Sequence, residues 1–425
     1  MDKILIKNGR VVDPLNGIDD IRDVIIAGGV IEKVGKGLES DDAKVIDAKG
    51  LTVTPGFIDI HVHFREPGYE YKETIATGAK AAVAGGFTSV VCMPNTKPVL
   101  DNPETFDHFR RLAERADCRV YGLASATKGM GGKELTDFAA LRDRGALGFT
   151  DDGGTVQNGR LVYEGLIIAK ELGIPVVQHC EDMHFMNDRS INQGEVARKL
   201  GCIGVPGIAE DLIVLRDIYL AEKTGGHIHI QHVSSKGSVQ LIREAKKRGV
   251  KVTCEVTPHH FTFTEDVVLR EGPNAKMSPP LRTQEDLDEI IMGIKDGTID
   301  AIATDHAPHT DEEKTKGLVD GPNGIIGLET ALGLAITELH ERHGVGLKRI
   351  FEMLSVNPAS ILKIKGGSLT PGEPADVTII DLNREWVVQK DKFFSKARNM
   401  PYEGMRLKGK PVATIVGGKI VYEES

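Results

Sequence analysis

The chain has 425 residues, more than a single hydrophobic core usually serves, so we expect one large domain and a smaller one. Hydrophobic residues make up 40% and charged residues 27%, an ordinary globular composition, and no run of 18 apolar residues predicts a transmembrane helix. The net charge of −9 and the lack of long like-charge runs exclude the basic footprint of a nucleic-acid-binding protein.

The two ends of the chain carry similar hairpin signals. IKNGRVVD (6–13), IAGGVIEKV (26–34) and IVGGKIVYE (415–423) each join apolar strands through a turn that contains glycine. Because the ends resemble each other and differ from the middle, we expect residues 1–54 and 366–425 to form one small β-sandwich domain.

The middle of the chain, residues 55–365, alternates short apolar strands with helical stretches such as 71–86 and 237–249. The strand candidates are 57–62, 88–93, 119–124, 146–150, 174–179, 227–232, 251–256 and 299–304. Eight strands separated by helices over about 250 residues predict an α/β fold of the (β/α)8, TIM-barrel type. A doubly wound sheet is the alternative, but it usually has fewer strands, and no G-x-G-x-x-G follows the first one.

Polar side chains gather where the predicted strands end. Barrel enzymes carry their chemistry at this C-terminal rim. The residues found there are His61, His63, Arg65, Asn95, Asp151, Asp152, His179, His232, Asp305 and His309. Five imidazoles and at least two carboxylates on one rim predict a metal site.

The first His-x-His pair has the spacing of a strand face. Alternation along the strand places Asp59, His61 and His63 on one side, and Ile58 and Ile60 on the other. Histidine and carboxylate together suit Zn²⁺, with Mn²⁺, Co²⁺ or Fe²⁺ as alternatives. The rim offers enough ligands for two ions that share a carboxylate.

Other histidines and acids have simpler explanations. His227 and His229 open their strand and should point to the opposite rim, so we interpret them as structural. For His259 and His260 we expect loop packing or hydrogen bonding. Asp151 could merely form a turn before the glycines that follow.

Several stretches of the chain together carry a family resemblance, namely DIHVHFREPG, ATDHAPHTDEEK, FTDDG, QHCED, HVSSKGS, EVTPHH and IVGGK. The first two are similar to the two signatures of the dihydroorotase family in the amidohydrolase superfamily, and the others resemble its bacterial long form (class I). The resemblance implies a zinc-dependent enzyme that interconverts N-carbamoyl-L-aspartate and (S)-dihydroorotate in de novo pyrimidine biosynthesis. It also implies a cytoplasmic homo-oligomer that could form a complex with aspartate transcarbamoylase. The scattered cysteines and the absence of a secretory signal also favour the cytoplasm.

The resemblance also assigns two zinc ions per subunit to particular positions. The implied ligands are His61 and His63 for the first ion, His179 and His232 for the second, Asp152 as the bridge, and Asp305, which completes the first site and serves as the general acid/base. Many relatives bridge their metals with a carbamylated lysine, but FTDDG contains no lysine.

A second set of positions would hold the substrate. The implied residues are His63, Arg65, Asn95, Ser278, His309, Asn323 and Gly324. This chain departs from the family at two of them: Ser278 stands where asparagine is frequent, and Asn323 where phenylalanine is frequent.

The expected reaction is attack of a metal-bridging hydroxide on the ring amide, with Asp305 moving the proton and Arg65 holding the substrate carboxylate. A dihydropyrimidinase or allantoinase would open a related ring and is one alternative. A non-catalytic partner of aspartate transcarbamoylase is another, but it would be expected to lack ligands. The glycine-rich segment 317–327 could be a lid or an ordinary surface loop.

Overall fold

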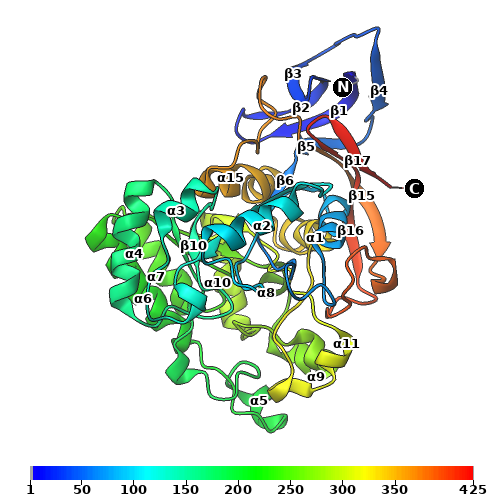
Figure 1. The fold of residues 1–425 in the computed structure, drawn as a ribbon. Coiled ribbons are helices and arrows are strands. Elements are labelled where there is room, and N and C mark those ends of the chain that lie inside the picture. The colour runs from blue at the N-terminus through cyan, green and yellow to red at the C-terminus, as the bar shows by residue number, and fades with distance from the viewer. Residues whose placement is uncertain (1–2, 425) are drawn as a thin grey trace.

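Strands from both ends of the chain come together in one sheet (Figure 1). The structure is a computed structural model that describes residues 3–424. The sheet order is β17-β16-β15-β5-β1-β2-β3, with β4 beside β1. Its strands are β1 (Lys3–Asp13), β2 (Ile18–Ala27), β3 (Val30–Gly35), β4 (Ala43–Asp47), β5 (Thr52–Pro55), β15 (Val377–Val387), β16 (Arg406–Val416) and β17 (Lys419–Glu423). Antiparallel pairing of β5 with β15 joins the two chain ends.

Two of the three predicted hairpins are confirmed, and the first is wrong. Glycines with positive φ connect β2 to β3 and β16 to β17. The expected turn at Asn8 and Gly9 is instead an irregularity inside β1, where the register against β2 shifts between Ile6 and Gly9. Asn8 takes a φ of 62°, and a Cβ on Gly9 would lie 2.6 Å from Val53 Cγ2. The strand therefore continues past this point because glycine lets β5 approach closely.

The middle of the chain forms parallel strands in sequential order, and all eight predicted strands are present. They are β6 (Phe57–Val62), β7 (Phe87–Cys92), β8 (Arg119–Gly122) continuing as β9 (Ala124–Ser125), β10 (Phe149–Thr150), β11 (Val176–Gln178), β12 (Ile228–Ile230), β13 (Val252–Val256) and β14 (Ala301–Ile302). A parallel bridge between Val62 and His306, with the His63 N–H donating to His306 O (2.9 Å), returns the last strand to the first. The strands thus close into a barrel.

Helices follow the strands and cover the barrel (Figure 1). They are α1 (Ile75–Ala84), α2 (Pro103–Ala113), α3 (Phe138–Asp143), α4 (Gly159–Leu172), α5 (Glu195–Lys199), α6 (Ile208–Thr224), α7 (Lys236–Lys247), α8 (Pro258–Thr262), α9 (Val268–Glu271), α10 (Gln284–Asp296), α11 (Asp311–Lys314), α12 (Gly317–Asp320), α13 (Ala331–Leu334), α14 (Leu347–Phe351) and α15 (Asn357–Leu362). The helix predicted over 71–86 begins only at Ile75, because Thr74 forms a capping box with Thr77.

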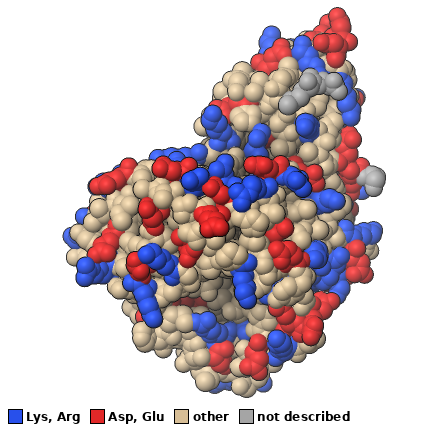
Figure 2. All heavy atoms as spheres, in the orientation of Figure 1, with Lys and Arg blue, Asp and Glu red and all other residues tan. Residues whose placement is uncertain are grey.

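Every side chain of β6 is buried, since helices cover one side of the strand and neighbouring strands surround the other. Phe57 lies between Phe87 and Phe351, with ring centroids 5.9 and 6.0 Å away. Acidic and basic side chains are interspersed over the visible surface (Figure 2). Within residues 3–424, no helix combines the length and apolarity needed to cross a membrane.

Candidate active site

The C-terminal ends of the barrel strands surround a cavity of about 160 Å³. Most of the residues predicted for the site line it: His63, Arg65, Asn95, Asp152, His179, His232, Ser278, Asp305, His309 and Asn323. His61 is fully buried in the wall beside them. The residues that the strand-end rule predicted to meet therefore lie around one cavity.

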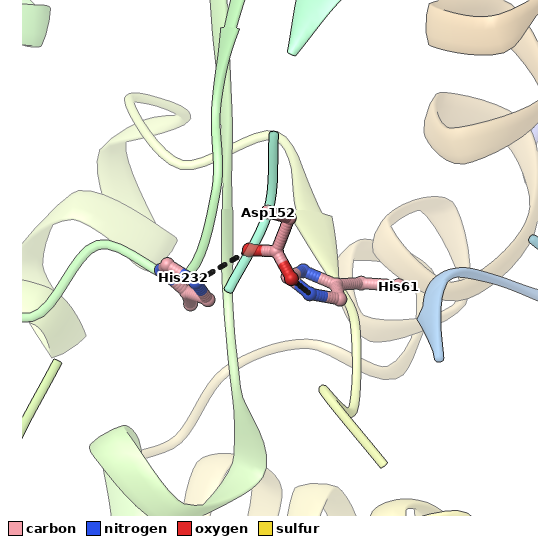
Figure 3. A group of neighbouring side chains, drawn as sticks. All are labelled: His61, Asp152 and His232. Carbon is pink, nitrogen blue, oxygen red and sulfur yellow. Dashed lines mark ion pairs between the residues drawn. The ribbon is translucent and has the colours of Figure 1, made fainter. Parts of the chain in front are cut away.

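Asp152 lies at the centre of the histidines and directs one oxygen to each pair. Its Oδ2 is 3.4 Å from His61 Nε2 and 3.3 Å from His63 Nε2. Its Oδ1 is 3.4 Å from His179 Nδ1 and 3.5 Å from His232 Nε2. Figure 3 shows the carboxylate between His61, which lies in β6, and His232, which lies in the segment after β12. A carboxylate in this position can serve two cations at once.

Asp305 joins only the first pair. Its Oδ1 is 3.4 Å from His61 Nε2 and 3.0 Å from His63 Nε2. Two triads can each hold a cation, namely His61 with Asp152 and His232, and His61 with His63 and Asp305.

Three buried atoms of this cluster support the fit to a metal. Among the described residues, no hydrogen-bond partner is found for His61 Nε2, Asp152 Oδ1 or Asp305 Oδ1. Buried polar atoms are normally paired, so these three point to a ligand that the protein does not itself supply. Imidazole nitrogen and carboxylate oxygen are donors that suit Zn²⁺.

The acidic and imidazole groups of this cluster shift one another's pKa values. Burial disfavours the charged form of Asp152, but the field of His61 and the nearby rings of His179 and His232 hold its pKa well below the ordinary value. Burial opposes the charged form of His179 as well, yet Asp152 and Glu181 raise its pKa to about 10. Metal binding requires neutral imidazoles, so a cation here would replace bound protons.

Three of the imidazoles have an acceptor at the ring nitrogen turned away from Asp152. These acceptors are Glu255 for His61 (2.5 Å), Asn95 for His63 (3.0 Å) and Glu181 for His179 (2.7 Å). Such outer contacts fix which nitrogen of the ring faces a metal. Asn95, predicted to bind substrate, thus also orients a candidate ligand. Neither glutamate was singled out from the sequence, although a carboxylate inside the apolar stretch KVTCEV was a signal for a buried partner.

Arg65 and His309 lie together on one side of the cavity. Arg65 Nε donates to Pro308 O (3.2 Å), and Nη2 is 3.3 Å from His309 Nε2. Lys72 Nζ is 3.3 Å from His309 Nδ1 and forms an ion pair with Glu313 (2.8 Å). Burial, followed by the charges of Arg65 and Lys72, lowers the pKa of His309, so this ring is neutral. A guanidinium beside a neutral imidazole can receive a carboxylate.

The two positions at which the chain departs from the family that it resembles, Ser278 and Asn323, also lie at the cavity. Ser278 Oγ donates to Glu181 Oε2 (2.5 Å), so its hydroxyl is already engaged. Asn323 lines the cavity, and among the described residues its buried Oδ1 has no partner. Gly324 N donates to Lys276 O (3.0 Å), and with a φ of 153° its Cβ, if present, would lie 2.5 Å from Ala307 O.

Asn399, which nothing in the sequence indicated, joins the two loops that carry these residues. Its Oδ1 accepts from His309 N (3.0 Å), and its Nδ2 donates to Ala307 O (3.0 Å) and Gly324 O (2.9 Å). Its backbone oxygen accepts from Ile326 N (3.0 Å). The side chain of Asn399 is fully buried. Through these hydrogen bonds, a segment near the C-terminus holds the two loops of the site together.

Three residues at the site have left-handed backbone conformations that are uncommon outside glycine. The φ angles are 64° for Arg65, 31° for His232 and 45° for Asp305. Each such residue costs about 1–3 kcal/mol and persists only where its surroundings hold it. These conformations turn the side chains away from the regular strand direction at the rim.

Three further polar residues near the strand ends, Asp151, His259 and His260, were interpreted in terms of turns or packing. Asp151 accepts hydrogen bonds from Ser125 Oγ and Thr127 N, so it stabilises a neighbouring loop and does not join the cluster. His260 bonds to Thr257 and Pro279 O, as expected for a packing role. Both it and His259 lie in α8, a short helix.

Asp59 does not join the candidate ligands, although it was expected to share their face of the strand. Its carboxylate accepts from the N–H groups of His61 and Thr304. The register between β6 and β7 shifts between Asp59 and Val62, so strict alternation fails there.

Comparison with known proteins agrees with this geometry. Residues 50–238 match the family described as Dihydro-orotase-like. The chain is 48% identical to a dihydroorotase of Clostridioides difficile (strain 630) over 420 residues, covering 99% of both chains. It is 46% identical to a dihydroorotase of Aquifex aeolicus (strain VF5) over 425 residues, the full length of both.

Solved structures of related hydrolases share the fold. The L-hydantoinase (dihydropyrimidinase) from Arthrobacter aurescens matches with a TM-score of 0.91 and 25% identity, over 100% of this chain and 97% of that one. A dihydropyrimidinase from Brevibacillus agri NCHU1002 matches with a TM-score of 0.87 and 22% identity, over 99% and 95%, which supports the fold alone. Sequence identity is thus much higher to the dihydroorotases than to these neighbours. The chain belongs to the dihydroorotase family of cyclic amide hydrolases.

Proposed function

We propose that this protein interconverts N-carbamoyl-L-aspartate and (S)-dihydroorotate in pyrimidine biosynthesis, with two zinc ions at the barrel rim. The observation that carries the proposal is the position of Asp152, whose two oxygens face two separate histidine pairs. The intact ligand set argues against a non-catalytic relative.

The first zinc would be held by His61, His63 and Asp305, the second by His179 and His232, with Asp152 shared. Bound zinc lowers the pKa of water and polarises a carbonyl group. The buried atoms of Asp152 and Asp305 that lack partners are the groups such ions would satisfy.

Asp305 would move the proton. Its carboxylate lines the cavity next to His63, where it can take a proton from attacking water and return it to the ring nitrogen as the amide C–N bond breaks. In the reverse direction, the same carboxylate accepts the proton from the nitrogen as the ring closes and water leaves. General acid/base catalysis needs a group within hydrogen-bond reach of both atoms, and the position of Asp305 in the cavity wall supports this role.

Arg65 would bind the carboxylate that substrate and product share. Its planar guanidinium offers parallel N–H donors that match two carboxylate oxygens. His309 lines the same cavity, and its neutral ring accepts at Nε2 from Arg65 (3.3 Å), which would hold the guanidinium in place for the substrate carboxylate. Asn95, Ser278, Asn323 and Gly324 would complete the substrate surface.

The proposal is tested by assaying (S)-dihydroorotate, dihydrouracil and allantoin beside metal analysis of the same preparation. We expect hydrolysis of dihydroorotate alone, loss of activity after chelation and recovery on addition of Zn²⁺. Preferential hydrolysis of dihydrouracil or allantoin would refute the proposed substrate. Neither compound has the carboxylate of dihydroorotate that Arg65 is proposed to bind. Full activity in metal-free protein would refute the zinc assignment.

We also propose that the protein self-associates. Helices α4 and α6 are neighbours and expose large apolar side chains, including Tyr163, Leu215 and Tyr219. Covering such side chains is a usual reason for association. Sedimentation of the native protein and of Leu215→Lys tests this: a monomer in both would contradict it. The aspartate transcarbamoylase complex stays a prediction.

A further inference from the structure

The second His-x-His pair is built into the barrel interior. His229 lies in β12 and is 1% exposed. Its Nε2 is 3.1 Å from Glu255 Oε2, and its Nδ1 is 2.9 Å from Thr253 Oγ1. Thr253 Oγ1 is in turn 2.8 Å from Nε2 of His227, which lines a separate cavity of about 390 Å³. These groups form a continuous hydrogen-bonded column.

Glu255 connects this column to the candidate metal site. Its Oε1 is 2.5 Å from His61 Nδ1, so both of its oxygens face an imidazole. The residue is 1% exposed, and a carboxylate so buried is tolerated only when both oxygens are paired. Glu255 is therefore an integral part of the polar network inside the barrel.

The hydrogen-bond directions along the column are consistent with one another. A carboxylate only accepts, so His61 Nδ1 and His229 Nε2 must both carry hydrogen. Beyond His229, the hydroxyl oxygen of Thr253 lies 2.9 Å from His229 Nδ1 and 2.8 Å from His227 Nε2, and a hydroxyl can donate to one ring while it accepts from the other. With hydrogen on Nδ1, His61 leaves the lone pair of Nε2 directed at Asp152.

One neighbour competes for the same nitrogen. The side-chain nitrogen of Gln231 is 3.2 Å from His61 Nδ1. An amide N–H cannot donate to a nitrogen that already carries hydrogen, and the contact with Glu255 is much shorter. The oxygen of Gln231 accepts from Thr150 Oγ1, which holds its amide in this orientation.

We propose, on the basis of the metal site proposed above, that Glu255 is a positioning residue that fixes the tautomer and orientation of His61, and that His229 holds Glu255 in place. The second His-x-His pair is then part of the metal site's support, although it binds no metal itself. Outer contacts of this kind typically change metal affinity 10- to 100-fold when removed.

The test measures zinc affinity of the chelator-treated protein by competition with a chromophoric chelator, without reference to activity. Glu255→Gln retains an oxygen that can accept from His61 but loses the charge, and we expect about tenfold weaker zinc binding. Glu255→Leu removes the acceptor, and we expect about 100-fold weaker binding. Glu289→Gln is the matched control, because Glu289 is a buried carboxylate paired with Arg243 on the outer helices.

A second readout follows the tautomer directly. In metal-free protein with ¹⁵N-labelled histidine rings, His61 should carry hydrogen on Nδ1, and this signature should be lost in Glu255→Leu. Should Glu255→Leu not fold, Glu255→Gln and His229→Phe decide the question by the same two measurements. Wild-type zinc affinity in Glu255→Gln and His229→Phe, or a wild-type His61 that carries no hydrogen on Nδ1, would overturn the proposal. Tight zinc binding without hydrolysis of dihydroorotate would instead reject only the proposed substrate.

Discussion

Replacing Asn399 with alanine should weaken both the fold and substrate binding, because this side chain joins two loops of the site. The substitution leaves His309 N–H, Ala307 O and Gly324 O without the partners that lie 2.9–3.0 Å away. A buried group that loses its partner costs about 1–3 kcal/mol. Water entering the new space offsets part of this, so we expect a total loss of about 3–5 kcal/mol.

This loss of free energy should be seen partly in substrate binding and partly in thermal stability. If about 1.4 kcal/mol falls on the placement of His309 and Gly324 in the folded protein, KM for dihydroorotate rises about tenfold while kcat changes much less. The remainder lowers the melting temperature by roughly 2–4 °C. Steady-state kinetics and thermal denaturation check the two parts, with zinc content measured in parallel.

The matched control is Asn383→Ala. Asn383 is exposed, and no hydrogen bond of its side chain is found within residues 3–424. We expect wild-type KM and melting temperature for this variant. If Asn399→Ala behaved like the control in both measurements, the supporting role of the C-terminal segment would be refuted.

Three further substitutions test individual groups. Asp305→Asn should lower turnover about 10²- to 10⁴-fold while much of the bound zinc remains, as metal analysis beside kcat will check; wild-type turnover would exclude the acid/base role. Arg65→Lys should raise KM roughly ten- to a hundredfold because the paired donors are lost, and an unchanged KM would argue against the carboxylate contact. Glu329 is a partly buried carboxyl whose pKa burial raises to about 7 in the folded protein. Its contribution to stability is therefore complete below pH 4.5 and lost as the pH rises through 7. The free energy of unfolding is measured for Glu329→Gln and for the wild type from pH 5 to 8. Over this range the variant should gain at most about 3 kcal/mol of stability relative to the wild type. A difference in unfolding free energy that does not change with pH would contradict this.

The local pattern of the sequence was enough to predict the barrel and its rim. Apolar strands and intervening helices recur at regular spacing, and parallel strands all end on the same side, so residues after different strands must meet. His61, His179 and His232 were expected together for that reason, although they are far apart in the sequence.

Register and long-range packing decided the rest. Whether Asp59 joins the ligands depends on a shift in pairing between β6 and β7, which alternation cannot reveal. Glu255 and His229 lie on adjacent strands, and only their pairing brings the side chains together. Asn399 reaches His309 across 90 residues, because a segment near the C-terminus packs under the loops of the site. Sequence periodicity thus determined which faces of the chain are buried, while the tertiary structure alone decided which buried polar groups become partners.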